Sequence, residues 1–376
     1  MIKVGIVTIF DRKNFGNRLQ NYAAQTVLRR MGISCKTLVP AGKYYPSAKA
    51  RVVLWGKALV CKALGYRLAT NHTSLLKRYH VDHFNRFIDF DPVACKNYRF
   101  PESLRDRYDC FVTGSDQVWN PYFWKSSMGN EDDGFSNNLL CFARPEQRKC
   151  LSPSISLQEL PSEWNERFRD AWLTYRDLGV REKEGAALIE RLTGRTDVVQ
   201  TIDPTLMLDA EDWQKVARVN KGRPKGKYAL YMFLGAEPEE IPAEKQQYLS
   251  AMLERTQMQA LRMNDRAQPA VNASGPSEFI DLIQHADLVI TDSFHCVVFA
   301  FLFDKPFLLF TRHAKQNIDM SSRTDTLLSM LALERKQMDR QVWDDEHIFE
   351  HDYAISREKL LAARQALQTF LEKSFR

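Results

Sequence analysis

The chain of 376 residues is poor in features that mark secreted, disulfide-bonded or redox-active proteins. It has seven cysteines, no two of which form a CxxC pair, at positions 35, 61, 95, 110, 141, 150 and 296. An odd count without a pairing pattern favours buried, reduced thiols, which are typical of proteins in a reducing compartment. The cysteines therefore argue against a disulfide framework.

Targeting and membrane-spanning segments are also missing from the sequence. No run of about 18 apolar residues occurs, so no transmembrane helix is predicted. The segment Met1–Phe10 leads directly into a strand pattern and has no small-residue cleavage site, so no signal peptide is predicted. These absences and the cysteine pattern together predict a cytoplasmic protein.

No convincing metal motif is present. His347 and His351 are four residues apart, with Glu350 between them, and would share one face of a helix. Their order differs from the HExxH pattern of zinc proteases, and the sequence offers no evident third ligand. We therefore predict no metal and no bound cofactor.

Acidic residues are nearly absent from one region of the chain, although the overall charge, +6, is mild. From Lys43 to Arg86 the only acid is Asp82, while nine residues are basic: Lys43, Lys49, Arg51, Lys57, Lys62, Arg67, Lys77, Arg78 and Arg86. Apolar residues interleave the first part of this region: Val52, Val53, Trp55, Leu59, Val60, Leu64 and Tyr66.

Two interpretations of this basic region stay open. It is either a solvated helical excursion of the N-terminal domain, over residues 43–90, or a basic amphipathic surface that contacts anionic lipid or a lipid-diphosphate substrate. The second interpretation predicts peripheral binding at the inner membrane face. No nucleic-acid-binding motif accompanies the charge, so nucleic acid is not an expected partner.

Strand-like runs alternate with helical periods, which favours βαβ units and parallel sheets. Runs typical of strands are Lys3–Ile9, Tyr108–Thr113, Leu178–Glu182, Tyr228–Phe233, Gln259–Met263, Asp287–Thr291 and Pro306–Phe310. Helical periods cover Asn17–Met31, Lys183–Leu192, Ala243–Gln257, Ser277–Gln284, Cys296–Phe303, Thr324–Leu333 and the stretch from Ser356 onwards. The predicted fold is α/β, with two doubly wound domains facing a cleft.

The polar segment Lys221–Lys227 predicts a domain boundary. We expect an N-terminal domain at 1–222, a C-terminal domain at 223–352, and an amphipathic helix at 353–376 that packs back on the body. The last expectation rests on an apolar stripe with helical spacing, formed by Leu360, Ala363, Leu367, Phe370 and Leu371.

Ligands of such sheets bind at the carboxyl ends of strands, so the residues after each strand are the candidates. Asn14, Gly16, Asn17 and Arg18 follow the first strand. Gly16 allows a tight turn, and the free N–H groups at the start of the next helix attract phosphate or carboxylate. Asn17 and Arg18 add further donors. An ordinary loop and helix cap stays open as the alternative.

The second candidate is the segment Thr291–His295 at the end of a buried strand. Asp292 and Ser293 precede His295, which falls in the first turn of the next helix. A histidine there is well placed to exchange protons with a bound group, and the positive helix end favours its neutral form. A core histidine bonded to backbone stays open as the alternative.

Two further strand ends carry polar groups. Arg181 follows the strand that begins at Leu178, where an arginine either binds an anion or forms an ordinary salt bridge. Gly114, Ser115 and Asp116 follow another strand and offer small, polar groups that suit a sugar.

These segments together resemble the polysaccharide pyruvyl transferase family. The matching pieces, in the family's order, are NFGNRLQNYAAQ at 14–25, GSDQVWNP at 114–121, VREKEGAALIERL at 180–192, DPT at 203–205, GPSEF at 275–279, ADLVITDSFHCVVFAFLFDKP at 286–306 and SSRTDTLL at 321–328. The joint match spans most of the chain and is specific, whereas each piece alone is not.

The resemblance implies two Rossmann-like domains in a glycosyltransferase-B-like arrangement. It implies phosphoenolpyruvate as the donor co-substrate and a glycan or lipid-linked sugar as the acceptor, with a pyruvate ketal as product. His295 is the implied acid/base residue and Arg181 the implied donor-anion residue. The remaining residues expected to bind donor or substrate are Asn14, Gly16, Asn17, Arg18, Gly114, Ser115, Asp116, Asp292, Ser293 and Arg323.

The chain departs from the family pattern at three places, one of which is Asp292-Ser293, where some branches of the family carry an arginine shortly before the histidine. Cys296 follows the motif histidine where the family usually has glycine, and 148–154 replaces an expected Tyr-Ala-Ala-Ser-Phe-like strand end. Two alternatives therefore stay open: a nucleotide-sugar glycosyltransferase of the same architecture, and a catalytically idle member that binds glycan or acts as a scaffold.

Overall fold

The computed structural model describes residues 1–10, 14–41, 48–63, 73–124, 130–235, 241–311, 322–337 and 344–376. Contacts between Cα atoms divide the chain into two compact units. Unit 1 comprises Met1–Arg51, Asn85–Leu208 and Leu361–Arg376, and unit 2 comprises Val52–Phe84 and Asp209–Leu360. The chain thus enters unit 2 at Asp209 rather than at the predicted linker, and most of the basic excursion belongs to unit 2. Part of that excursion, at 42–47 and 64–72, lies outside the described residues.

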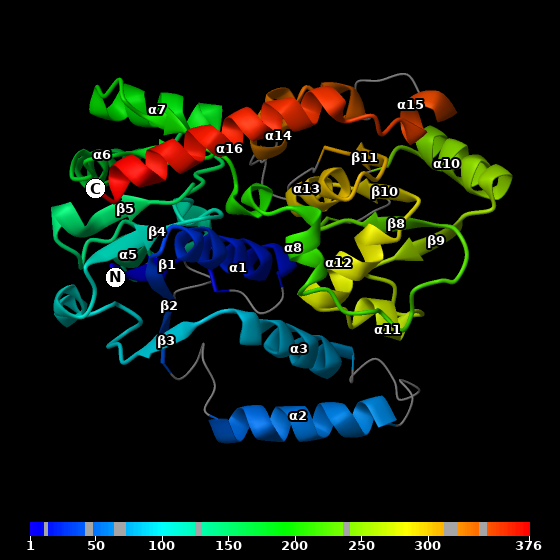
Figure 1. The fold of residues 1–376 in the computed structure, drawn as a ribbon, viewed down its shortest axis with the longest axis horizontal. Coiled ribbons are helices and arrows are strands. Elements are labelled where there is room, and N and C mark those ends of the chain that lie inside the picture. Colours follow the sequence, from blue (N-terminus) through cyan, green and yellow to red (C-terminus); the bar gives the residue numbers. More distant parts are fainter. Residues whose placement is uncertain are drawn as a thin grey trace. The chain divides into compact units, whose positions relative to one another are not determined.

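Unit 1 is built on a five-stranded sheet in the order β3-β2-β1-β4-β5, in which every pair is parallel. The strands are β1 (Lys3–Val7), β2 (Ser34–Pro40), β3 (Phe90–Val93), β4 (Cys110–Thr113) and β5 (Arg148–Cys150). β1 lies between β2 and β4, so the strand order reverses direction at β1 (Figure 1). In open parallel sheets such a reversal point is where ligands bind.

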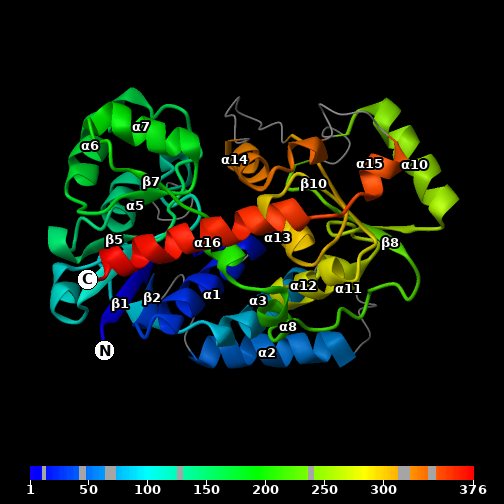
Figure 2. The ribbon, with the colours of Figure 1, turned by 45° about the horizontal axis from the view of Figure 1, so that its top comes forward.

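Helices and a second, two-stranded sheet complete unit 1. The main helices are α1 (Phe15–Arg30), α5 (Glu131–Asn138), α6 (Asn165–Leu173) and α7 (Lys183–Thr193), and the small parallel sheet pairs β6 (Gly179–Val180) with β7 (Val199–Gln200). α6 and α7 lie side by side (Figure 2). α7 is followed by Gly194, whose left-handed φ of 74° is typical of a glycine that ends a helix.

Unit 2 contains a four-stranded parallel sheet in the order β11-β10-β8-β9. The strands are β8 (Tyr228–Met232), β9 (Gln259–Arg262), β10 (Leu288–Thr291) and β11 (Phe307–Leu309). The helices are α2 (Ala48–Ala63, of which Val52–Ala63 falls in this unit), α3 (Thr73–Phe84), α8 (Ala210–Gln214), α10 (Ala243–Thr256), α11 (Pro269–Asn272), α12 (Pro276–Gln284), α13 (Phe294–Leu302), α14 (Ser322–Leu331) and α15 (Asp345–Phe349). The order reverses at β8, between β9 and β10.

The last helix is α16 (Ala354–Ser374), which the predicted apolar stripe describes correctly. Leu367, Phe370 and Leu371 are buried, and the part of α16 from Leu361 onwards belongs to unit 1. There Arg364 donates from Nε to the carbonyl oxygen of Leu206 at 2.6 Å and from its NH2 group to that of Leu208 at 3.1 Å.

The predicted α/β class with parallel sheets is confirmed in both units. The glycosyltransferase-B-like arrangement of two domains facing a cleft stays a prediction. Among the residues that the structure describes, no helix is both long and apolar enough to cross a membrane.

Gly275, at the start of α12, has a packing role that is testable. Its N–H donates to Glu278 Oε2 at 3.0 Å, and a Cβ added to it would lie 2.7 Å from the carbonyl carbon of His80 in α3. We predict that Gly275→Ala lowers the free energy of unfolding by about 1–3 kcal/mol, because α12 would have to move away from the α3 backbone.

The prediction is checked by urea unfolding of Gly275→Ala, measured in parallel with the control variant Gly226→Ala. Gly226 lies in the loop before β8, with no atom within 4 Å of the position that a Cβ would take, so its substitution should leave stability unchanged or slightly raised. Equal unfolding midpoints for the two variants would show that the α3–α12 approach is looser than the structure indicates.

Candidate functional site

In unit 1 a chain of hydrogen bonds joins the carboxyl ends of β1 and β4 to the first turns of α1. Gln20 donates from Nε2 to Thr8 Oγ1 at 2.8 Å and accepts at Oε1 from the Ser115 N–H at 3.1 Å. Thr8 Oγ1 in turn donates to the carbonyl oxygen of Ser115 at 3.0 Å. All three side chains are buried, so the loop after β4 is fixed against α1 at the point where the strand order reverses.

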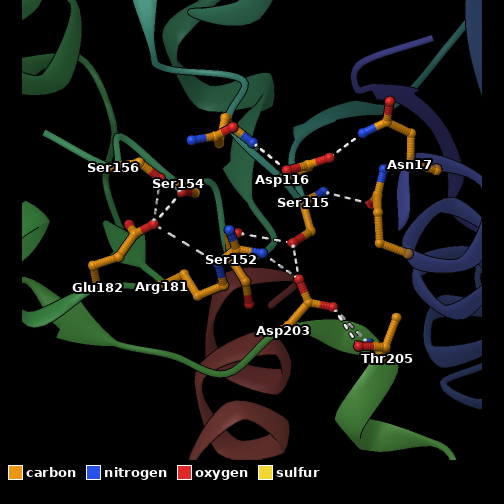
Figure 3. A network of polar contacts seen from close by, with 12 residues as sticks. Asn17, Ser115, Asp116, Ser152, Ser154, Ser156, Arg181, Glu182, Asp203 and Thr205 are labelled. Atoms are coloured by element: carbon orange, nitrogen blue, oxygen red, sulfur yellow. Dashed lines mark hydrogen bonds and ion pairs between the residues drawn. The ribbon is translucent and has the colours of Figure 1, made fainter. Parts of the chain in front are cut away.

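Asp116 connects this loop to Asn17. The Asn17 amide donates to Asp116 Oδ2 (Figure 3). The Gln117 N–H donates to Asp116 Oδ1 at 2.9 Å. Asp116 has a φ of 69°, a left-handed conformation that aspartate tolerates better than most residues. A carboxylate of the protein itself therefore occupies the amide that the sequence assigns to a bound anion.

The other residues predicted at the start of α1 have different roles. Asn14 is the exposed N-cap residue and forms no side-chain cap hydrogen bond, while Gly16 is buried in the first turn. Arg18 is buried, donates to the carbonyl oxygen of Ile9 at 3.0 Å, and lies 4.3 Å from the centre of the Phe10 ring. Arg18 thus holds Ile9 and Phe10, which follow β1, in place.

Arg181, directly after β6, forms a buried ion pair with Asp203 (Figure 3). Asp203 Oδ2 also accepts from Ser115 Oγ at 3.1 Å, and its Oδ1 accepts from the N–H and the hydroxyl of Thr205 at 3.0 and 2.7 Å. Burial alone would lower the pKa of Arg181, but Asp203, Glu182 and Asp116 together raise it. The guanidinium is therefore a permanent positive charge, held in one orientation.

Glu182 is held on the other side of Arg181 by the segment that follows β5. Ser154 and Ser156 both donate to Glu182 Oε1, the latter at 3.1 Å, and the Ile155 N–H donates to Oε2 at 3.3 Å. The Arg181 N–H donates to the carbonyl oxygen of Pro153 at 3.0 Å. The segment that departs from the family pattern, 148–154, is thus part of the wall around Arg181.

In unit 2 the candidate residues lie where the strand order reverses between β8 and β10. Asp292, just after β10, accepts from the N–H groups of Leu234 and Gly235, which follow β8, at 2.8 and 3.1 Å. The Thr291 hydroxyl donates to the carbonyl oxygen of Met232 at 2.6 Å and accepts from the Ser293 N–H at 3.0 Å. These bonds fix the two strand ends to each other.

His295 lies in the first turn of α13, on the platform that these bonds create. Its ring centre is 5.2 Å from that of Phe294, and the side chain is largely buried. Ser293 is the N-cap residue, and its side chain forms no cap hydrogen bond. The neighbouring Cys296 is fully buried, and burial raises the pKa of its thiol to about 12. Cys296 is therefore a neutral packing group.

The structure thus brings the predicted residues together in two separate sets. In unit 1 Asp203 joins Arg181 to Ser115, which lies with Gly114 and Asp116 in the loop after β4, and Asp116 contacts Asn17. Unit 2 gathers Asp292, Ser293 and His295, and Arg323 lies half-buried in the first turn of α14.

Sequence reasoning missed the roles of several residues in unit 1. In the sequence Asp203 stands out only as part of the DPT match, and Glu182 only as the end of a strand run. The signal for Asp203 was present, because Asp-Pro after an extended run marks a fixed turn, but its partner could not be read from spacing.

The structure also bears on metal binding. Within the described ranges, no group of three His, Cys, Asp or Glu side chains is arranged to hold a metal ion. His347 instead pairs with Asp344, whose carboxylate lies 2.7 Å from Nδ1.

Comparison with solved structures gives distant fold likenesses. The chain is similar to Acinetobacter baumannii MurG at 9% identity, covering 99% of each chain with a TM-score of 0.41. It is similar to a putative UDP-N-acetylglucosamine 2-epimerase from Listeria monocytogenes at 10% identity, covering 98% of this chain and 90% of the other with a TM-score of 0.45. For the E. coli heptosyltransferase WaaC the identity is 12%, the coverage 96% and 100%, and the TM-score 0.37.

Comparison with curated protein sequences gives no significant match. The family model of the polysaccharide pyruvyl transferases, by contrast, matches residues 14–313. The match begins at the N-cap of α1, contains both sets of strand-end residues up to His295, and covers most of the chain. The chain belongs to the polysaccharide pyruvyl transferase family, and it is an enzyme of that family.

Proposed function

We propose that the protein transfers the enolpyruvyl group of phosphoenolpyruvate to two hydroxyls of a hexose and forms a pyruvate ketal. The acceptor would be a cell-surface polysaccharide or its lipid-linked precursor. The observation that carries this proposal is the family match over residues 14–313, because it includes both Arg181 and His295 in their expected motifs.

The reaction requires one group that moves protons and cations that hold the donor. Protonation of the methylene carbon of phosphoenolpyruvate makes it a methyl group and leaves an oxocarbenium-like centre. One sugar hydroxyl attacks this centre, phosphate leaves, and the second hydroxyl closes the ketal. Of the two hydroxyl protons, one replaces the proton given to the methylene carbon and the other departs with phosphate.

His295 is the residue that we assign to proton transfer. It lies at the carboxyl end of β10, where Asp292 and Thr291 fix the backbone with four hydrogen bonds. A group that must meet a carbon atom in one geometry benefits from such a rigid support. The neighbouring Cys296 is a buried neutral thiol, so it does not compete as a proton donor.

Arg181 is the residue that we assign to the donor's negative charge. Its pairing with Asp203 fixes the guanidinium and does not remove its charge, since the surrounding carboxylates raise its pKa. A fixed cation needs no reorganisation when phosphate or carboxylate charge approaches. We further propose that Asp203 acts as a positioning residue for Arg181.

The first prediction concerns His295. Replacing it by Ala should lower kcat by roughly a hundredfold to ten-thousandfold, as expected for loss of a general acid. His351→Ala, an exposed histidine after α15, should keep full activity. The measurement is phosphate release with a saturating acceptor. If His295→Ala melts far below the wild type and the control does not, His295 is a core histidine and the assignment is wrong.

The second prediction separates the charge of Arg181 from its structural pairing. Arg181→Met leaves Asp203 as a buried carboxylate without its partner and should destabilise the protein by about 3–5 kcal/mol. The double variant Arg181→Met/Asp203→Asn should recover a large part of this loss, because neither charge remains. Its KM for phosphoenolpyruvate should nevertheless stay raised, and its turnover low. Recovery of normal kinetics together with stability would assign Arg181 a purely structural role.

The third prediction concerns the donor. Phosphoenolpyruvate at about a hundred times its Kd should stabilise the wild type by roughly 2.7 kcal/mol, seen as a rise in melting temperature. A nucleoside diphosphate should give a smaller rise, and phosphate should be released from phosphoenolpyruvate only when a glycoside acceptor is present. A larger rise with the nucleoside diphosphate would favour a nucleotide-sugar glycosyltransferase. A rise with glycoside alone, without phosphate release, would favour an idle binding protein.

A further inference from the structure

One face of α2 carries apolar side chains that the structure leaves exposed. Val52, Val53, Leu59 and Val60 are exposed to 69%, 49%, 54% and 59%. At about 100° per residue these four positions fall in one arc of the helix, which we call the α2 outer face. Of the 13 large apolar side chains that are exposed in the described part of the chain, these four and Trp55 lie on this one helix. Clustering of this kind marks an interaction surface.

The opposite side of α2 is packed in unit 2. Leu54 and Ala58 are buried, and Ala58 belongs to an apolar cluster with Leu76 of α3 and Ala273. The rings of Trp55 and Tyr79 of α3 contact at 6.3 Å between centres. α2 is thus anchored by one apolar side, beside α3 in Figure 1, while its other apolar side is presented outward.

Basic residues far outnumber acidic residues in the same region. Residues 43–86 hold nine of the chain's 53 basic residues and one of its 47 acidic residues, so the remainder has 44 basic and 46 acidic residues. The single acid, Asp82, is buried, whereas Lys49 and Lys57 of α2 and Arg78 of α3 are exposed. The excess positive charge of the whole chain therefore lies in the region that carries the α2 outer face.

We propose that the α2 outer face docks on an anionic lipid bilayer, with Lys49 and Lys57 against the headgroups and Val53, Leu59 and Val60 in the interface. In such a membrane the apolar side chains can enter the boundary between headgroups and acyl chains, and the flanking cations can contact the anionic headgroups. Nucleic acid would match the cations but leave the apolar arc unused. A second copy of the helix would match the arc but bring like charges together.

Vesicle binding tests the proposal without any turnover, so it can fail while the proposed function stands. Wild-type protein should cosediment with phosphatidylcholine vesicles that contain phosphatidylglycerol, but not with phosphatidylcholine alone. Binding should be lost at high salt, because the screening length falls from about 10 Å at 0.1 M salt to about 3 Å at 1 M.

Variants distinguish the two parts of the surface. Lys49→Gln/Lys57→Gln should weaken binding on the order of tenfold, since each cation near such a surface contributes about a fivefold factor at most. Leu59→Ser/Val60→Ser should also weaken it. The matched controls are Lys221→Gln/Lys225→Gln and Leu173→Ser/Val219→Ser, which remove exposed residues of the same kinds elsewhere and should bind as the wild type does. Melting temperatures verify that each variant is folded.

Trp55 provides a second readout, because it borders the α2 outer face and is partly exposed. Brominated lipid should quench part of the wild-type tryptophan fluorescence, and Trp55→Phe should remove that part. The proposal is wrong if folded wild-type protein ignores anionic vesicles at low salt or binds neutral vesicles equally well. It is also wrong if the α2 outer face instead forms a concentration-dependent dimer in lipid-free solution that Leu59→Ser/Val60→Ser abolishes.

Discussion

The buried pair of Arg181 and Asp203 is the interaction on which the rest of unit 1 depends. Removing two charges from water costs several kcal/mol for each ion, and their attraction offsets this only when the remaining hydrogen-bonding groups are also satisfied. Ser115 and Thr205 supply those bonds to Asp203. The pair therefore requires that the loop after β4 and the turn after β7 both be in place. The main effect of the pair is therefore to favour one arrangement of the strand ends, and its net contribution to the free energy of unfolding is the smaller effect.

Parallel sheets explain why these polar residues meet. A parallel sheet brings the carboxyl ends of its strands to one edge, and the strand order reverses at β1, directly before α1. In unit 2 the same topology at β8 brings Asp292 to the N–H groups of Leu234 and Gly235. In unit 1 Asp203, which follows β7 of the two-stranded sheet, accepts from Ser115 in the loop after β4 and pairs with Arg181. In unit 2 Asp292 holds the loop after β8 close to the start of α13, which carries His295.

Much of this framework was predictable from the sequence, because it rests on local patterns. The apolar runs of β1, β8 and β10 and the helical period of α7 predict elements within a few residues of those observed. Asn17, Asp116 and Arg181 were each selected as residues after a strand. Their mutual contacts were not predictable, because they join positions 99 and 22 residues apart in the chain, namely Asn17 with Asp116 and Arg181 with Asp203. Spacing carries no information on such pairs, so the anion site expected at α1 could not be distinguished from an internal carboxylate contact.

Two of the departures from the family pattern, Cys296 and the segment 148–154, have different physical consequences. Cys296 is a buried packing residue whose Sγ lies 3.2 Å from Met232 Sδ. Because its thiol is neutral, it leaves the charge around His295 unchanged. The segment at 148–154 instead lies in the wall of the buried polar cluster. Ser154 donates to Glu182, and Pro153 accepts from the Arg181 N–H, so a change in this segment alters what surrounds the guanidinium. The change at 148–154 therefore acts on the surroundings of Arg181 in unit 1, whereas Cys296 leaves the four hydrogen bonds that support His295 in unit 2 in place.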